Sequence, residues 1–211
     1  MSRQILTGNQ AFNLWESCLR KIYNTPASVT VVTGEWKTGK TDTSLYIAFD
    51  ELKEKLGIIK KIGTNIKVFK DEKFTELDDR IAYIDNFVDL EMFLFQDKKP
   101  KVFIFDEAIK SAPSRKAMSQ INTKWLDYVP ELSKAKCHLI VVTQSKNYME
   151  KLFLDPIFVR AEWRKINKTT VILTILKPTI EIHIFHDVPG TSLKFDPYRQ
   201  AIWRMHPEKK M

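Results

Sequence analysis

The sequence has little cysteine and contains no long apolar run. Only Cys18 and Cys137 are present, each among apolar neighbours, which favours two buried thiols in a reducing compartment over a disulfide framework. No stretch approaches the roughly 18 apolar residues of a membrane span, and residues 1–10 lack the apolar core of a signal peptide. We therefore expect no transmembrane segment and a cytoplasmic protein, in the host cytoplasm if the owner is a virus.

Acidic residues are outnumbered. Lys and Arg total 34 against 26 for Asp and Glu, which gives a net charge of +8. A basic surface attracts polyanions such as nucleic acid or anionic lipid, although a solvated lysine-rich surface explains the same excess. The length of 211 residues and a hydrophobic content of 44% fit one folded domain, with or without an appendage.

Helices are predicted where apolar residues recur at helical spacing. An amphipathic helix over 10–23 places Phe12, Trp15, Leu19 and Ile22 on one stripe that packs on the core. Further helices are expected over 40–56, from a cap at Asp85 or Asn86 through Gln96, and over 114–135.

Strands are predicted at short runs rich in β-branched and aromatic residues. The three clearest are 28–34, 101–105 and 137–144, with weaker ones at 62–69 and 80–84. Because such runs are apolar on both faces and alternate with helices, they indicate an α/β fold with a mostly parallel sheet. Beyond Pro156, three runs separated by Asn-Lys and Lys-Pro predict an antiparallel meander.

Residues 34–41, GEWKTGKT, match the phosphate-binding pattern G-x-x-x-x-G-K-[ST] in full, between a predicted strand and a predicted helix. Backbone N–H groups of such a loop point into one concavity, where the helix dipole also favours negative charge. Lys40 would reach the β- and γ-phosphates, and the Thr41 hydroxyl would bind Mg²⁺. We predict an ATP site formed by Gly34, Glu35, Trp36, Lys37, Thr38, Gly39, Lys40, Thr41 and Asp42.

Two residues of this loop are unusual. Lys37 stands where many such loops carry glycine, and we expect its side chain either in solvent or against a phosphate. Trp36 is bulky for a phosphate loop, so it would stack on a base or a neighbouring subunit, or pack on its own loop.

A second constellation, VFIFDEA at 102–108, ends a predicted buried strand in two adjacent carboxylates. Ligands of open α/β sheets lie at the carboxyl ends of the strands, which would bring Asp106 beside the phosphate loop. Asp106 would then hold hydrated magnesium, and Glu107 would orient or deprotonate the attacking water. This pair suits hydrolysis of ATP better than phosphate transfer to a small acceptor.

Four further residues are candidates for contact with the reacting phosphate. Gln144, or the adjacent Thr143, follows a predicted strand and would sense the γ-phosphate through a hydrogen bond. In oligomeric ATPases an arginine of the neighbouring subunit neutralises charge on the transferring phosphoryl group. Arg115 and Arg160 are candidates for that role, and a surface salt bridge or a contact with a DNA phosphate is the alternative for each.

The order GEWKTGKT, IFDEA, SRKAMSQIN followed by a Trp-containing helix, LIVVTQ and DPIFVRAEW resembles the HerA/FtsK-type P-loop ATPases over roughly residues 28–165. That group includes compact Zot-like and genome-packaging members of viruses and plasmids. The resemblance implies a three-layer RecA-like core, assembled into rings that are usually hexamers and that pump DNA by ATP hydrolysis. It also implies that Asp106 is the Walker B carboxylate, Glu107 the catalytic glutamate and Gln144 the sensor.

The leading expectation is an oligomeric ATPase, with ATP and Mg²⁺ as cofactors, that translocates or packages double-stranded DNA. One alternative is an assembly or secretion ATPase acting on a protein or membrane partner, and another is a nucleotide-gated DNA-binding module with little hydrolysis. Within the chain we expect an N-terminal helical appendage at 1–26, the ATPase core at 27–157, an antiparallel β extension of the same domain at 158–206, and a frayed tail at 207–211.

Overall fold

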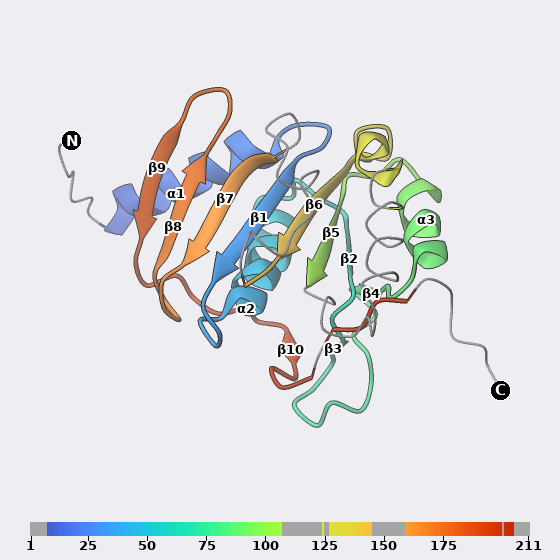
Figure 1. Cartoon of the computed structure of the whole chain (residues 1–211). Helices are drawn as coiled ribbons and strands as arrows, with labels where there is room; N and C mark the ends of the chain where they lie inside the picture. The colour runs from blue at the N-terminus through green and yellow to red at the C-terminus, as the bar shows by residue number, and fades with distance from the viewer. Residues whose placement is uncertain (1–7, 107–123, 125–126, 145–158, 200, 205–211) are drawn as a thin grey trace.

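A sheet of eight strands runs through the protein in the order β4-β2-β5-β6-β1-β7-β8-β9 (Figure 1). The structure is a computed structural model that describes residues 8–106, 124, 127–144, 159–199 and 201–204. The strands of the sheet are β1 (Val29–Gly34), β2 (Lys61–Thr64), β4 (Ala82–Tyr83), β5 (Lys101–Asp106), β6 (Cys137–Val142), β7 (Val159–Lys165), β8 (Val171–Ile175) and β9 (Glu181–Phe185). A separate antiparallel pair is formed by β3 (Val68–Phe69) and β10 (Lys194–Phe195).

Across the sheet, the first six strands, β4-β2-β5-β6-β1-β7, are parallel to one another. The last two, β8 and β9, continue the sheet in antiparallel fashion. Burial also differs along the sheet. Every residue of β6 is buried, as in a strand covered on both faces, while burial alternates along β8, as in a strand covered on one face. The predicted sheet, mostly parallel with antiparallel strands at its C-terminal end, is confirmed.

Helices cover both faces of the sheet, which gives three layers (Figure 1). One face carries α1 (Gly8–Tyr23) together with α2 (Lys40–Leu45) and its continuation η1 (Tyr46–Lys55), and the other carries α3 (Phe87–Phe95). Consecutive strand residues face opposite layers: Val32 joins the core beneath α1 and α2, and Val31 joins the core beneath α3. The expected three-layer α/β architecture is therefore confirmed.

Helix α1 packs on the sheet through the stripe that its sequence predicts, with one exception. Trp15, Leu19 and Ile22 are buried, and the Trp15 ring meets Phe185 edge-on at 4.9 Å between centroids. The prediction for Phe12 was wrong, because its side chain is 51% exposed. Phe12 lies toward the N-terminal end of α1, and its ring is covered by the Lys55 ammonium at 3.7 Å instead of by the core.

The predicted helix over 40–56 exists but changes its hydrogen bonding along its length. From Tyr46 it is a π-helix, and it ends before Gly57, which adopts a positive φ of 62°. The single strand predicted over 62–69 is instead two short strands, β2 and β3, and the strand predicted at 80–84 is reduced to β4.

The remaining predicted helices fare differently. Asn86 caps α3 by accepting a hydrogen bond from the Asp89 N–H, as the predicted start required. Most of the helix predicted over 114–135 lies outside the described residues, and its described end contains a 3-10 turn, η3 (Pro130–Leu132).

Cys18 and Cys137 are buried free thiols. Among the described helices, none is both long and apolar enough to cross a bilayer.

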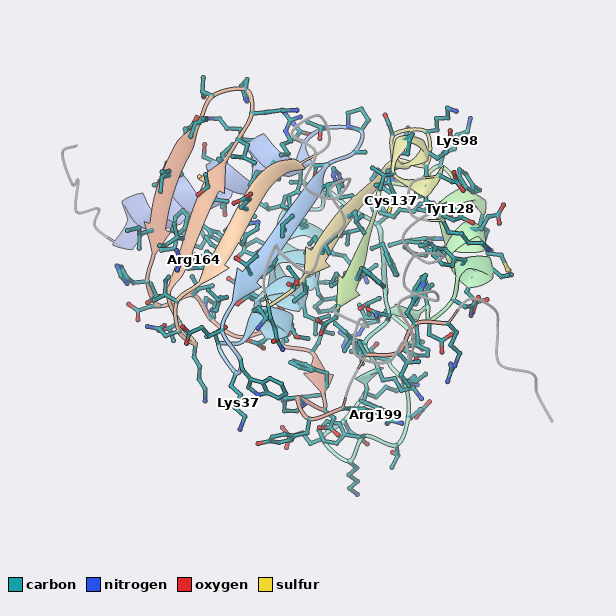
Figure 2. The ribbon with its side chains drawn as sticks, in the orientation of Figure 1. Lys37, Lys98, Tyr128, Cys137, Arg164 and Arg199 are labelled. Carbon is teal, nitrogen blue, oxygen red and sulfur yellow. The ribbon has the colours of Figure 1, made fainter. Side chains whose placement is uncertain are left out.

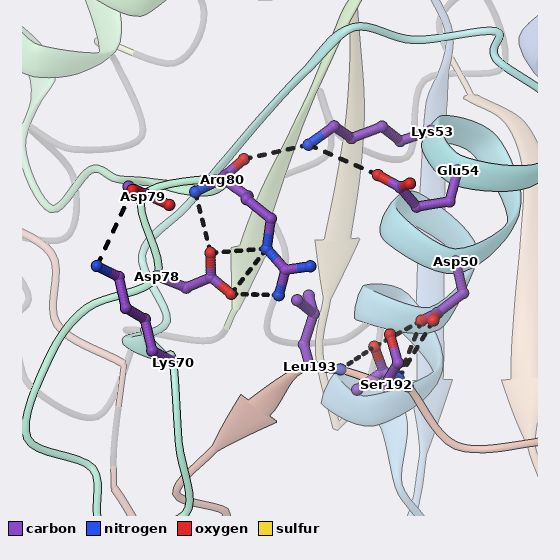
Figure 3. Close-up of polar contacts among 10 residues, drawn as sticks. Asp50, Lys53, Glu54, Lys70, Asp78, Asp79, Arg80, Ser192 and Leu193 are labelled. Atoms are coloured by element: carbon purple, nitrogen blue, oxygen red, sulfur yellow. Dashed lines mark hydrogen bonds and ion pairs between the residues drawn. The ribbon is translucent and has the colours of Figure 1, made fainter.

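The connection between β9 and β10 crosses the helix that follows the phosphate loop. Asp50 accepts hydrogen bonds from the Thr191 hydroxyl at 2.7 Å and from the Ser192 N–H at 3.2 Å, and Figure 3 shows its carboxylate facing Ser192. Asp42 accepts the Thr191 N–H at 3.1 Å. The last part of the chain is thereby fixed to the first turns of the helix that begins at Lys40.

Candidate nucleotide site

The loop between β1 and α2 uses glycine where its geometry requires it. Gly39 is left-handed, with φ 84° and ψ 31°, directly before α2. Gly34 lies against β7, because a Cβ at this position would come within 2.8 Å of the Lys165 carbonyl oxygen. Lys37 also has a positive φ, of 62°, at the position where glycine is common in such loops. A left-handed conformation costs a residue with a side chain about 1 to 2 kcal/mol.

The carbonyl of Glu35 organises the inside of the loop. It accepts the Thr38 hydroxyl at 2.8 Å and the Lys40 ammonium at 2.8 Å. Lys40 therefore starts from a neutral acceptor within its own loop, and a phosphate oxygen would replace that acceptor with a stronger, charge-assisted one.

The phosphate loop and the end of β5 meet directly. The Thr41 hydroxyl donates to Oδ2 of Asp106 at 2.8 Å, although the two residues are 65 positions apart. A hydroxyl and a carboxylate side by side are oxygen ligands of the kind that Mg²⁺ uses in nucleotide sites, so these residues fit the predicted metal. The structure thus brings together the two residues that the sequence assigned to magnesium.

The backbone of Asp106 is held by a residue that the sequence analysis missed. Asn65 donates its Nδ2 to the Asp106 carbonyl at 2.9 Å and accepts the Asp106 N–H on Oδ1 at 2.8 Å. Asn65 directly follows β2, the strand that pairs with β5, and it is 1% exposed. Its amide extends the β2–β5 ladder by one residue after β2 has ended. The signal in the sequence was an asparagine after an apolar strand, but the predicted strand over 62–69 ran through it.

Thr143 and Gln144 lie at the same edge of the sheet as the loop. The Thr143 N–H donates to the Val32 carbonyl at 2.9 Å, so residue 143 continues the pairing of β6 with β1. Gln144 is the next residue and is half-buried. Glu107 and Arg115 lie outside the described residues, and their assigned roles stay predictions.

Arg160 lies at the opposite end of β7 from the phosphate loop. The parallel pairing of β1 with β7 runs from Val29 opposite Val159 to Gly34 opposite Lys165. Arg160 lines a cavity of about 290 Å³ together with Lys177 and the segment before β1, and no described residue hydrogen-bonds to its buried Nε. It therefore cannot reach a nucleotide bound in its own phosphate loop, and a role at a nucleotide phosphate requires the site of another subunit.

The two unusual loop residues both face outward. Lys37 is exposed, and Figure 2 shows its side chain pointing away from the sheet. Trp36 is 62% exposed. Such exposure is what stacking on a base or on a neighbouring subunit would require.

The first turn of α2 carries a carboxyl group with a perturbed acidity. Burial raises the pKa of Asp42, while the Thr191 N–H and the nearby Lys165 ammonium oppose that rise. The same Lys165 ammonium has its pKa lowered by burial. One acid and one base that are both partly removed from water therefore lie next to the phosphate loop.

No family model and no curated protein sequence matches the chain. Several solved structures are similar to it. The N-terminal domain of zonular occludens toxin from Neisseria meningitidis is 22% identical over 75% of this chain and 93% of that chain, with a TM-score of 0.44. The genome packaging NTPase B204 from Sulfolobus turreted icosahedral virus 2, solved in complex with AMPPCP, is 12% identical over 78% and 100% of the two chains, with a TM-score of 0.46. EssC (ATPases 2 and 3) from Geobacillus thermodenitrificans is 12% identical over 80% of this chain and 38% of that chain, with a TM-score of 0.52.

The strand order, the strand–loop–helix at Gly34 to Lys40 and the contact between Thr41 and Asp106 define the fold of a P-loop ATPase with a RecA-like core. The likeness to EssC supports the same fold. The fold expected from the order of motifs is confirmed.

Proposed function

We propose that this chain binds and hydrolyses ATP, and that as a homo-oligomeric ring it uses the hydrolysis to translocate or package double-stranded DNA. The observation that carries the proposal is the 2.8 Å hydrogen bond from Thr41 to Asp106, because it joins the phosphate loop to the strand-end acid in one site. The net charge of +8 supports a polyanionic partner.

In this proposal the loop binds the triphosphate through its backbone N–H groups, and the Lys40 ammonium moves from the Glu35 carbonyl to the β- and γ-phosphates. Thr41 and Asp106 would hold Mg²⁺, which when bound neutralises phosphate charge. Asn65 keeps the Asp106 backbone in place.

The remaining proposed roles belong to the residues that surround the γ-phosphate. Glu107 follows Asp106 and would accept a proton from the attacking water, while Gln144 would donate a hydrogen bond to the γ-phosphate. Arg160, if it takes part, acts on the nucleotide of a neighbouring subunit, since the β1–β7 register keeps it from its own. Arg115 is the other candidate for that role.

The test is ATP hydrolysis with and without double-stranded DNA, together with measurement of the molecular mass in the presence of nucleotide. We expect DNA to stimulate turnover and nucleotide to favour the oligomer. Lys40→Ala and Glu107→Gln should each lower kcat by roughly 100-fold or more, the range for loss of a positioned acid–base group or charge clamp. Lys98→Ala, at an exposed lysine between α3 and β5, is the matched control and should turn over normally.

Each negative result has a distinct meaning. Steady turnover by Glu107→Gln would remove the assigned base. Tight ATP binding without phosphate release, with any polymer, would indicate a nucleotide-gated binding module. Hydrolysis without salt-sensitive DNA affinity in a filter-binding assay would indicate a protein or membrane partner, because DNA binding by a basic protein weakens steeply as salt rises.

A further inference from the structure

Lys165 lies directly beneath the phosphate loop. It is the last residue of β7 and pairs with Gly34, the first residue of the loop. A Cβ on Gly34 would come within 2.9 Å of the Lys165 Cβ, and a Cβ on Gly39 would lie 4.0 Å from its Cε. The lysine side chain therefore runs from one glycine of the loop to the other.

The ammonium of this side chain is unusually poor in partners. Lys165 is 2% exposed, and its Nζ donates to the Lys168 carbonyl at 2.8 Å in the turn between β7 and β8. Within the described part of the chain, no carboxylate lies at ion-pair distance from it; the nearest acid that influences it is Asp42. A buried ammonium with a neutral acceptor is costly, so its presence calls for an anion nearby.

We propose that Lys165 is a positioning residue of the phosphate loop, whose buried charge strengthens the binding of the polyphosphate from below while its stem supports the loop between Gly34 and Gly39. In this role it would act without touching the phosphates, because its ammonium is held by the Lys168 carbonyl in the turn after β7. Because the Lys165 side chain is 2% exposed, water screens its charge less than it would screen a surface charge. This inference rests on the proposed binding of ATP.

A second explanation is that Lys165 serves only as the charge partner of Asp42. The two explanations differ in what a nucleotide experiences. If Lys165 attracts phosphate, its removal weakens binding in proportion to the charge of the ligand, and removal of the Asp42 charge has the opposite effect. If the two residues serve only each other, neither substitution distinguishes one nucleotide from another.

The first arm of the test is Lys165→Met, which keeps the length of the stem and removes the charge. Binding of ATP, ADP, AMP and adenosine is measured by calorimetry. We expect affinity for ATP to fall at least tenfold, because Coulomb's law gives about that factor for each unit of ligand charge at a separation of about a nanometre and an effective dielectric constant near 20. The loss should decrease from ATP through ADP to AMP and vanish for adenosine.

The matched control is Lys168→Met. It removes a lysine charge three residues away in the same turn, from an exposed side chain, and leaves the carbonyl that Lys165 uses. Its effect on ATP affinity should be small, because an exposed charge is screened by water and salt.

The second arm is Asp42→Asn, which removes the acid and keeps an oxygen for the Thr191 N–H. We expect ATP affinity to rise several-fold, because the Lys165 charge is then no longer offset. Because loss of the Asp42 charge also relieves its own repulsion of phosphate, this arm supports the inference only if the rise is smaller in the Lys165→Met, Asp42→Asn double variant. Lys165→Gln replaces Lys165→Met if the latter fails to fold.

Suppose that the wild-type protein binds ATP. If Lys165→Met then loses affinity for ATP and adenosine equally, or for neither, this inference is overturned and the proposed function stands. A fall in ATP affinity for Asp42→Asn would overturn it as well. Wild-type protein that binds no nucleotide would overturn the proposed function itself.

Discussion

Replacing Asn65 with alanine removes both side-chain hydrogen bonds that hold the backbone of Asp106 at the end of β5. The carbonyl and the N–H of Asp106 then each lose the hydrogen bond to Asn65, and β2, which ends at Thr64, supplies no backbone group in its place. Asn65 is 1% exposed, so these two hydrogen bonds are made by a buried side chain.

The magnitude follows from the number of hydrogen bonds lost, which is two. A buried polar group without a hydrogen bond costs about 1 to 3 kcal/mol. Two such groups at the edge of a sheet, where water can partly replace the amide, give an expected loss of about 2 to 4 kcal/mol. This is a large part of the roughly 5 to 15 kcal/mol that stabilise a typical domain.

Urea unfolding of the wild type and of Asn65→Ala measures this loss as a shift of the urea midpoint, with the dependence of unfolding free energy on urea unchanged. Asn13→Ala, at an exposed position of α1, is the control and should change stability by less than about 0.5 kcal/mol. If the proposed function holds, magnesium-dependent hydrolysis should also fall, because Asp106 is no longer fixed beside Thr41. Equal stability of Asn65→Ala and Asn13→Ala would refute the reasoning.

Two further predictions concern buried basic residues. Burial, and then the charge of Arg160, lower the pKa of His138 from 6.5 to about 4. As the pH falls, the unfolded chain therefore binds a proton at this histidine before the folded protein does. The free energy of unfolding should fall by roughly 3 kcal/mol in total as the pH drops from 6.5 toward 4. Urea unfolding at several pH values should show a weaker dependence of stability on pH for His138→Gln and an unchanged one for the control His186→Gln, whose histidine is exposed. The same dependence on pH in the wild type and both variants would contradict the role given to His138. Lys101, fully buried, donates to three carbonyls at the end of α3. Lys101→Met should therefore lower the free energy of unfolding by about 2 to 4 kcal/mol. The control Lys98→Met, at an exposed lysine, should change it very little. A loss below about 1 kcal/mol for Lys101→Met would show that the carbonyls find other donors.

Much of the fold could be predicted because its signals are local. The strands β1, β5 and β6 are continuous apolar runs, and α1 and the helix after Lys40 carry apolar stripes at helical spacing. These patterns are set by which faces of each element are buried, and each element reveals them without its neighbours. The prediction for Phe12 was wrong because helical spacing does not tell how far along a helix the core extends.

The candidate site was predictable to the same extent and for the same reason. The glycine, lysine and threonine of the loop follow a fixed spacing because the loop folds around its own backbone, and the paired acids end a recognisable strand. The same reading passed over Asn65 and gave Lys165 no role. In the sequence, Asn65 resembles an ordinary polar loop residue after a strand. Lys165, at the end of a strand with alternating polar residues, resembles an ordinary surface lysine.

The sequence by itself determined the phosphate loop, the acids after β5, the order of strands and helices along the chain, and the change from parallel to antiparallel character near its end, because each depends on residues close together in the chain. Only the tertiary structure decided which strand lies beside which. That arrangement brings Asn65 to Asp106 across 41 positions, places the Lys165 side chain beneath Gly34 and Gly39, and separates Arg160 from the phosphate loop by the length of β7. Such contacts depend on the pairing of distant strands, and the pattern of a single segment carries no information about its partner.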